Sequence, residues 1–316
     1  MDGVSGLKDR LTIPAVLTVI SFGGLAVLQF LNIPLAIVAI AALVYLAVGR
    51  QFTVALISMA VSLLVSAMVG GQVLIIENVV LVLLPAAILT FGIRTNLSAK
   101  VAVFLVLIPV VIASAFYFAG VGSTDRYYAE IKPQIEQDFE RMTSEVNIQG
   151  NLNLSDEQME DVRDNYLGFV RFLVKYLPGL LLISFMTIAG ASYLLLQYLF
   201  EKRKMYIRRL PRFAVWKMPE GLLLLFGFSL LIVLLTSGLL EDIGENLALF
   251  CFTLFTLSGL SNVEFFMQKQ KLSKFARFLI YFALFIFNIY GALILGIIGL
   301  ADSHFDFRRV RAAQIG

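Results

Sequence analysis

Long apolar blocks separated by short polar breaks dominate the hydrophobic pattern of the chain. A helix needs about 20 residues to cross a hydrocarbon core of roughly 30 Å, and most of the blocks have about that length. The alternation typical of barrel strands does not occur, so the pattern predicts an all-α fold, a polytopic transmembrane helical bundle of about nine spans. The predicted spans are Leu11–Phe30, Pro34–Val48, Phe52–Val69, Val73–Phe91, Ala99–Ala119, Leu180–Phe200, Gly221–Leu240, Leu247–Met267 and Phe275–Leu300.

One polar segment, residues 120–166, interrupts this pattern and predicts an acidic helical hairpin outside the membrane. It divides the chain into an N-terminal membrane half of five spans, residues 1–119, and a C-terminal half of four spans, residues 167–316. The segment has far more acids than bases. The acids are Asp125, Glu130, Glu136, Asp138, Glu140, Glu145, Asp156, Glu157, Glu160, Asp161 and Asp164, and the bases are Arg126, Lys132, Arg141 and Arg163.

Two helices are expected in this insert. Ile131, Ile135 and Phe139 recur at a spacing of four, which predicts an amphipathic helix with Pro133 in its first turn, where proline is tolerated. Ser155 opens the sequence Ser-Asp-Glu-Gln, which resembles a capping box and predicts the start of a second helix. Apolar residues continue this second helix toward the sixth span. We therefore expect it to enter the membrane, with Pro178 as a kink.

The loop of residues 201–218 is the richest in basic residues, and the positive-inside rule makes it cytoplasmic. Counting spans from this loop places the N-terminus in the cytoplasm and residues 120–166 outside, which is typical of a multi-pass protein of a bacterial cytoplasmic membrane. Nine spans also place the C-terminal tail outside, where Arg308, Arg309 and Arg311 contradict the rule. The bases of the loop are Lys202, Arg203, Lys204, Arg208, Arg209, Arg212 and Lys217.

Composition supports a membrane protein and excludes several kinds of chemistry. Hydrophobic residues make up 59% of the 316 residues, charged residues only 15%, and the mean hydropathy is +0.87, so the bilayer is the main solvent. Phosphate loops, zincin helices and nucleophile elbows do not occur in the sequence. His304 is the only histidine and Cys251 the only cysteine, which leaves no intrachain disulfide. We expect no enzyme, no cofactor, no metal site and no nucleic-acid partner.

Three polar residues inside predicted spans are candidate ligand-binding residues. Glu77 lies within the fourth span, where an ionised side chain costs on the order of 3 kcal/mol and needs compensation. Asn78 is next to it, and Asn288 lies in the ninth span. Glu77 and Asn78 are expected to line a cavity open to the outside. The alternative is that Glu77 is close enough to the interface to reach water.

The basic loop is a candidate interface with lipid or with a protein partner. Trp216 is the only tryptophan, and its amphipathic ring is typical of a membrane interface. Arg208, Arg209, Arg212 and Lys217 suit anionic headgroups or an acidic membrane or cytoplasmic partner. The alternative is ordinary anchoring in the bilayer.

Two short segments carry a resemblance to a known family. Leu210-Pro211-Arg212-Phe213 is followed by Trp216-Lys217-Met218-Pro219, and Gly299-Leu300-Ala301-Asp302 is followed by Asp306-Phe307-Arg308. Both segments, with five spans before a polar insert, resemble the YybS-like family of bacterial membrane proteins. That family is distantly similar to S components of energy-coupling factor transporters and to MreD-type cell-shape proteins. S components have about six helices and no acidic insert, so no binding residue is carried over to this chain.

Two functions follow as hypotheses. The first is a substrate-capturing or transport-associated subunit without its own ATPase, which binds a small molecule near Glu77. The alternative is a membrane scaffold that binds other proteins in cell-envelope assembly. A polar cavity lined by several spans would favour the first, and exposed apolar side chains on the outer hairpin would favour the second.

Overall fold

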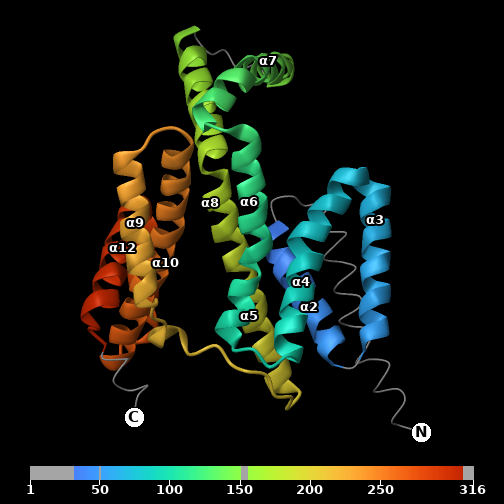
Figure 1. Ribbon diagram of the computed structural model, residues 1–316, viewed down its shortest axis with the longest axis vertical. Helices are drawn as coiled ribbons and strands as arrows, with labels where there is room; N and C mark the ends of the chain where they lie inside the picture. Colours follow the sequence, from blue (N-terminus) through green and yellow to red (C-terminus); the bar gives the residue numbers. More distant parts are fainter. Residues whose placement is uncertain (1–31, 50, 151–155, 309–316) are drawn as a thin grey trace. The chain divides into compact units, whose positions relative to one another are not determined.

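The computed structural model describes residues 32–49, 51–150 and 156–308 (Figure 1). All regular elements in these ranges are helices, which confirms the all-α prediction. The chain divides into two compact units. The first comprises the described residues up to Val111 together with Leu182–Leu210, and the second comprises Ile112–Leu181 and the residues from Pro211 onward.

The first unit is built around α2, whose alanine-rich sequence lets neighbouring helices approach closely. The side chains of Ala39, Ile40, Val44 and Leu46 are completely buried. Arg94, at the end of α4, donates a hydrogen bond of 2.7 Å to the carbonyl oxygen of Ala47 and so ties these two helices together. The helices of this unit are α2 (Asn32–Val48), α3 (Phe52–Asn78), the π-helix η2 (Val79–Leu83), α4 (Leu84–Arg94), α5 (Ala99–Leu105), the start of α6 (Leu107–Val121) and the end of α8 (Asp156–Lys202).

The second unit contains the insert and the C-terminal helices. In Figure 1, α9, α10 and α12 lie side by side, and α10 packs against both neighbours. The helices of this unit are the rest of α6, α7 (Thr124–Gly150), the first part of α8, the 3₁₀ turn η3 (Phe213–Val215), α9 (Glu220–Leu235), α10 (Leu239–Lys269), α11 (Lys274–Ile286) and α12 (Asn288–Phe305).

The insert consists of two helices, α7 and the start of α8, which we call the hairpin. The rings of Phe139 and Tyr166 lie 5.3 Å apart, and Arg163 forms an ion pair of 2.9 Å with Glu136, so α7 and the start of α8 pack together. The position predicted for Pro133 is wrong: α7 begins at Thr124, which places the proline in the helix interior. Ser155 lies outside the described residues.

The helix that starts in the insert continues into the predicted sixth span, as expected. α8 has 47 residues and contains Pro178 in its interior. At 1.5 Å per residue it is about 70 Å long, which is more than twice the thickness of a hydrocarbon core.

The predicted ninth span, Phe275–Leu300, is not a single helix. α11 ends at Ile286, and α12 begins after Phe287 with Asn288, whose φ of 45° is left-handed. α10 and α12 run in the same direction, because Thr256 bonds the carbonyl oxygen of Ala292 and Gly259 packs against Gly299 farther along both helices. α11 therefore runs opposite to both, and α11 and α12 form a hairpin.

Length and hydropathy identify five helices among the described residues that could cross a membrane: Gly71–Arg94, Ala99–Val121, Gln158–Lys202, Leu239–Lys269 and Asn288–Phe305. Three shorter apolar helices, Ile33–Val48, Phe52–Met68 and Glu220–Leu235, coincide with further predicted spans. The predicted first span, Leu11–Phe30, lies outside the described residues. The lengths and hydropathy of these helices are thus consistent with a membrane protein, whereas the count of nine stays a prediction.

Candidate functional site

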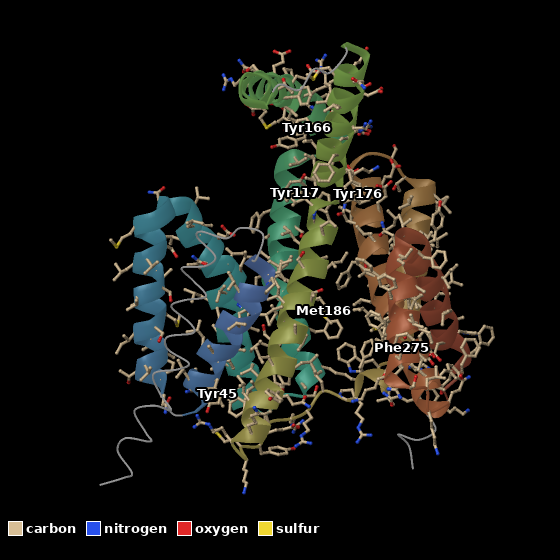
Figure 2. The ribbon with its side chains drawn as sticks, turned by 180° about the vertical axis from the view of Figure 1, so that it is seen from behind. Tyr45, Tyr117, Tyr166, Tyr176, Met186 and Phe275 are labelled. Atoms are coloured by element: carbon tan, nitrogen blue, oxygen red, sulfur yellow. The ribbon has the colours of Figure 1, made fainter. Side chains whose placement is uncertain are left out.

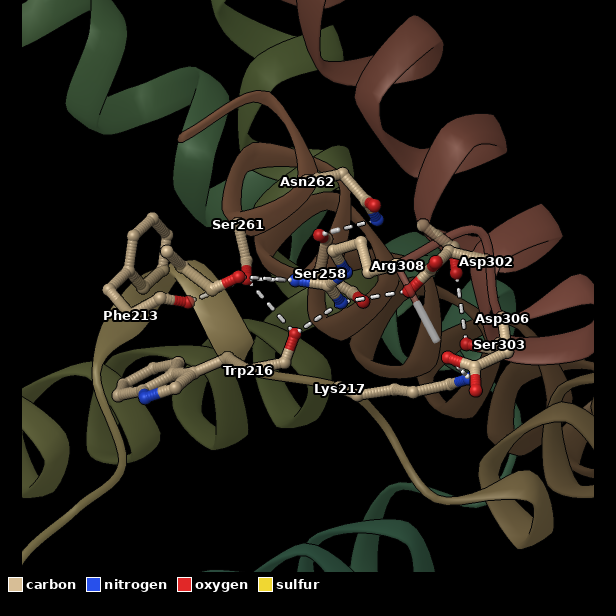
Figure 3. Close-up of polar contacts among 12 residues, drawn as sticks. Phe213, Trp216, Lys217, Ser258, Ser261, Asn262, Asp302, Ser303, Asp306 and Arg308 are labelled. Carbon is tan, nitrogen blue, oxygen red and sulfur yellow. Dashed lines mark hydrogen bonds and ion pairs between the residues drawn. The ribbon is translucent and has the colours of Figure 1, made fainter. Parts of the chain in front are cut away.

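The two sequence segments that carry the family resemblance meet in the second unit. α12 ends where Asp306 takes a left-handed conformation (φ 49°, ψ 52°), and this turn directs Arg308 back against the end of α10. The loop between Pro211 and Pro219 covers the same end of α10, because Ser261 donates a hydrogen bond to the carbonyl oxygen of Phe213. Loop, α10, α12 and tail thus form one cluster (Figure 3).

Arg308 is the centre of this cluster. Its Nη1 donates to the carbonyl oxygen of Ala214 at 2.9 Å and to Ser261 Oγ at 2.6 Å, and its Nη2 donates to the carbonyl oxygen of Trp216 at 2.7 Å. Nη2 also pairs with Asp302 Oδ2 at 2.8 Å, and both side chains of this ion pair are 0% exposed. A buried ion pair is stable only when further hydrogen bonds satisfy its atoms, and the two loop carbonyls and Ser261 supply them.

A second ion pair connects the same loop to the same turn. Lys217 Nζ lies 2.7 Å from Asp306 Oδ1, and the lysine side chain is only 8% exposed. Each pair joins a basic residue to an acidic one, so the cluster carries no net charge from these four side chains. The basic loop is therefore held to the C-terminal turn by one shielded ion pair and by the hydrogen bonds that Arg308 donates to its carbonyl oxygens.

Several polar atoms of this cluster are buried without a hydrogen-bond partner. They are Ser258 Oγ, Asn262 Oδ1, Asp302 Oδ1 and Arg308 Nε. Figure 3 shows these side chains close together, with Ser258 and Asn262 one turn apart on α10. Three oxygens and one N–H group suit a small polar molecule such as water, which typically makes about three hydrogen bonds when it is buried.

Close packing of α10 against α12 brings the cluster together. A Cβ atom on Gly299 would lie 1.9 Å from the carbonyl oxygen of Phe255, and one on Gly259 would lie 1.9 Å from that of Leu295. The two backbones therefore touch at these glycines. This contact sets the position of Asp302, which follows Gly299 by one turn of α12.

A second polar cluster of this unit surrounds Pro178 in α8. Proline has no N–H, so the carbonyl oxygen of Val174 loses its helical partner. The hydroxyl of Tyr117 donates to this oxygen at 2.8 Å. Figure 2 labels Tyr117 on α6, Tyr176 on α8 close to it, and Tyr166 in the hairpin.

A side-chain amide of α10 contacts the next pair of backbone groups of α8. Asn246 Oδ1 accepts from the backbone N–H of Gly179 at 2.8 Å, and Asn246 Nδ2 donates to the carbonyl oxygen of Lys175, also at 2.8 Å. The amide thus bridges the two groups that would bond each other in an unbroken helix. The carbonyl oxygen that Pro178 leaves without its helical partner is thus bonded from α6, and α10 bonds the backbone groups next to it.

The N-terminal end of α10, which carries Asn246, also holds the start of the insert. Asp242 is 4% exposed, and its Oδ2 accepts from the backbone N–H of Thr124, at the first residue of α7. Lys175 forms an ion pair of 2.8 Å with Glu245. The hairpin is thereby attached at its base to α10 as well as through its own helix.

The predicted ligand residues do not share one unit. Asn78 is buried in the first unit and donates to Ser66 Oγ, next to the π-helix η2, and Glu77 beside it is partly buried. Ser66 in turn donates to the carbonyl oxygen of Ser62. Asn288 belongs to the second unit, where it is exposed and allows the left-handed backbone between α11 and α12.

The predicted interface residues also fall into two groups. Arg208 and Arg209 are exposed in the first unit, where Arg209 pairs with Glu201 at 3.1 Å, and Arg212 is exposed in the second. Trp216 instead donates from Nε1 to the carbonyl oxygen of Pro211, and Lys217 is buried against Asp306. The last two residues therefore stabilise the loop.

Sequence reasoning missed the Arg308 cluster. The available signal was the position of three arginines in a tail that the span count placed outside, against the positive-inside rule. The structure brings the start of this tail into contact with the basic loop. Arg308 thus joins the loop that the sequence predicts to be cytoplasmic to the start of the tail that the sequence predicts to be outside.

Comparison with known proteins gives a family. Residues 12–303 match the model of a family described as predicted membrane protein (DUF2232). Neither the curated proteins nor the solved structures contain a match.

Proposed function

The chain belongs to the DUF2232 family of predicted membrane proteins, and on this premise we propose that it is a non-enzymatic membrane scaffold that presents its acidic hairpin to a protein partner. The observation that carries this proposal lies at Pro178, where Tyr117 bonds the carbonyl oxygen of Val174 that the proline frees and Asn246 bonds the neighbouring backbone groups of Lys175 and Gly179. A hinge would leave such groups free to exchange with water. Backbone groups that are bonded by α6 and α10 instead support a hairpin held at a constant angle to these two helices.

The surface of the hairpin supports the same proposal. Met142 on α7 and Val162 on α8 are each 44% exposed, and both lie among acidic residues. Arg141 and Arg163 adjoin them, but acids outnumber bases around both positions, so the surface suits a partner with a basic rim and an apolar centre. A cell-envelope protein of this kind is the proposed partner.

A photo-crosslinking amino acid at Met142 or at Val162, introduced in the native host, tests the scaffold function. We expect one protein adduct at both positions, detected by mass spectrometry after purification. Phe228 in α9 is 59% exposed on an apolar helix and serves as a matched control, at which we expect lipid adducts. Protein adducts at the control alone, or none at the hairpin, would contradict the scaffold.

Substrate capture is the second candidate, favoured by the irregular backbone near Asn78. Gly71 interrupts α3 with φ 62° and ψ −146°, and the π-helix η2 follows Asn78 directly. Such irregularities are frequent at functional sites in membrane helices. A small molecule that leaves the membrane with the wild type but not with Asn78→Ala would support this function. The resemblance to YybS-like proteins, S components and MreD stays a prediction under either candidate.

We further propose eight crossings and one re-entrant hairpin in a bacterial cytoplasmic membrane. α11 has 13 residues, about 20 Å, which is too short to cross, and α12 returns to the end where α10 finishes. Both termini and the basic loop are then cytoplasmic, and residues 120–166 are outside. This arrangement replaces the expected extracytoplasmic C-terminus and places the tail arginines in agreement with the positive-inside rule.

Cysteine labelling in intact cells tests this topology. In a Cys251→Ala background, we expect Phe307→Cys to be protected from a membrane-impermeant maleimide and to react once the cells are opened. The loop residue Lys271 and the residue Gly238, which lies in the turn between α9 and α10, provide cytoplasmic and external controls as cysteine variants. Labelling of Phe307→Cys in intact cells would return the C-terminus to the outside.

A further inference from the structure

A dense group of exposed cations follows the end of α8 in the first unit. Lys202, Arg203 and Lys204 are exposed, as are Arg208 and Arg209. Arg209 is partly neutralised by Glu201, whose carboxylate lies 3.1 Å away, and the other four have no acidic partner among the ion pairs of the described residues. We call residues 202–209 the cationic segment.

This segment is an ordered part of the unit. Met205 donates from its backbone N–H to the carbonyl oxygen of Phe200 at 3.0 Å, and the hydroxyl of Tyr193 donates to the carbonyl oxygen of Arg208 at 2.7 Å. Ile207 between them is buried. Both ends of the segment are thus fixed to α8, so its cations are held close to the helix end.

Aromatic rings place two of these cations. The ammonium of Lys202 lies 4.6 Å from the ring centre of Tyr198, and the guanidinium of Arg203 lies 5.7 Å from that of Tyr45. The ring of Tyr45 in turn packs against Phe200 at 5.4 Å. These contacts hold the two cations beside aromatic rings of α8 and α2.

The tip of the segment has the character of a membrane interface. Tyr206 is 86% exposed and Met205 is 40% exposed, although neither residue is charged. A tyrosine ring with an apolar body and a polar hydroxyl suits the headgroup level of a bilayer. Exposed apolar atoms between cations are costly in water and favourable between lipid headgroups.

We propose that the cationic segment is a binding site for anionic phospholipids, with Lys202, Arg203 and Lys204 on the phosphate groups and Tyr206 between the headgroups. Lysine and arginine bind phosphate oxygens through charge-assisted hydrogen bonds. This site does not include Trp216 and Lys217, because Trp216 bonds Pro211 and Lys217 pairs with Asp306 inside the second unit. The proposal rests on the membrane location of the family and is independent of the scaffold function.

Native mass spectrometry of the full chain tests the proposal. The protein is exchanged into micelles that contain equal amounts of phosphatidylglycerol and phosphatidylcholine, and the lipids that stay bound are counted. We expect the wild type to retain phosphatidylglycerol preferentially. The variant Lys202→Gln/Arg203→Gln/Lys204→Gln should lose roughly tenfold or more of this preference, because each base near a membrane surface contributes to the attraction of anionic lipid.

A matched variant removes three cations of the hairpin, namely Arg126→Gln/Lys132→Gln/Arg141→Gln, and we expect it to behave as the wild type. Tyr206→Ser tests the tip separately and should weaken retention while leaving the charge unchanged. Equal retention by the two triple variants would overturn the proposal. Unchanged lipid retention with loss of a copurified acidic protein would overturn it as well, in favour of a protein site.

Discussion

Gly299→Ala is expected to destabilise the second unit by roughly 3 kcal/mol or more, because the new methyl group cannot be accommodated between two backbones. Its Cβ would lie 1.9 Å from the carbonyl oxygen of Phe255 and 2.7 Å from the backbone nitrogen of Gly259. Neither atom belongs to a flexible side chain, so α10 and α12 must separate. Separation also moves Asp302 away from Arg308 and weakens the cluster at the end of both helices.

The single cysteine provides the measurement. Cys251 is completely buried in α10, so a thiol-reactive fluorescent dye reports unfolding in detergent. We expect the midpoint of the thermal transition to fall by about 6 °C or more. Gly227→Ala in α9 is the matched control, because nothing lies within 4 Å of its added Cβ. An equal midpoint for both variants would show that α10 and α12 do not touch at Gly299.

Apolar periodicity predicted the helices well where hydrophobic length decides the fold. α8 shows this, since the apolar positions of the insert continue without interruption into the sixth span. The reversal at Asn288 could not be predicted in this way, because Phe275–Leu300 is apolar on both sides of this residue and only its conformation divides the segment. Hydropathy measures the preference for lipid and carries no information on where the chain turns back.

The residues of the candidate site show the same limit. Asn246 and Asp242 are ordinary polar residues near a helix start, and their roles depend on the approach of α8 and α7 from distant parts of the sequence. Trp216 and Lys217 were recognised as a pattern, but the pattern predicts an interface whenever bases flank a tryptophan. Their actual contacts required the tail to be placed first.

Arg308→Gln is expected to cost roughly 3 to 5 kcal/mol, because it leaves the carboxylate of Asp302 buried without its counter-charge. It also removes donors from the carbonyl oxygens of Ala214 and Trp216. Trp216 is the only tryptophan, so its emission reports the loop directly, while the reactivity of Cys251 reports the helix bundle. We expect the tryptophan emission to shift to longer wavelength at temperatures where Cys251 is still protected.

A double-mutant cycle separates the ion pair from the loop contacts. Asp302→Asn alone should destabilise by a similar amount, and Arg308→Gln/Asp302→Asn should cost clearly less than the two single changes added together, because no uncompensated charge is left buried. Arg209→Gln is the control for loss of an exposed pair and should cost less than about 1 kcal/mol. Strict additivity within the cycle would mean that Arg308 stabilises the protein only through the loop carbonyls. The buried pair with Asp302 would then contribute nothing beyond its own desolvation.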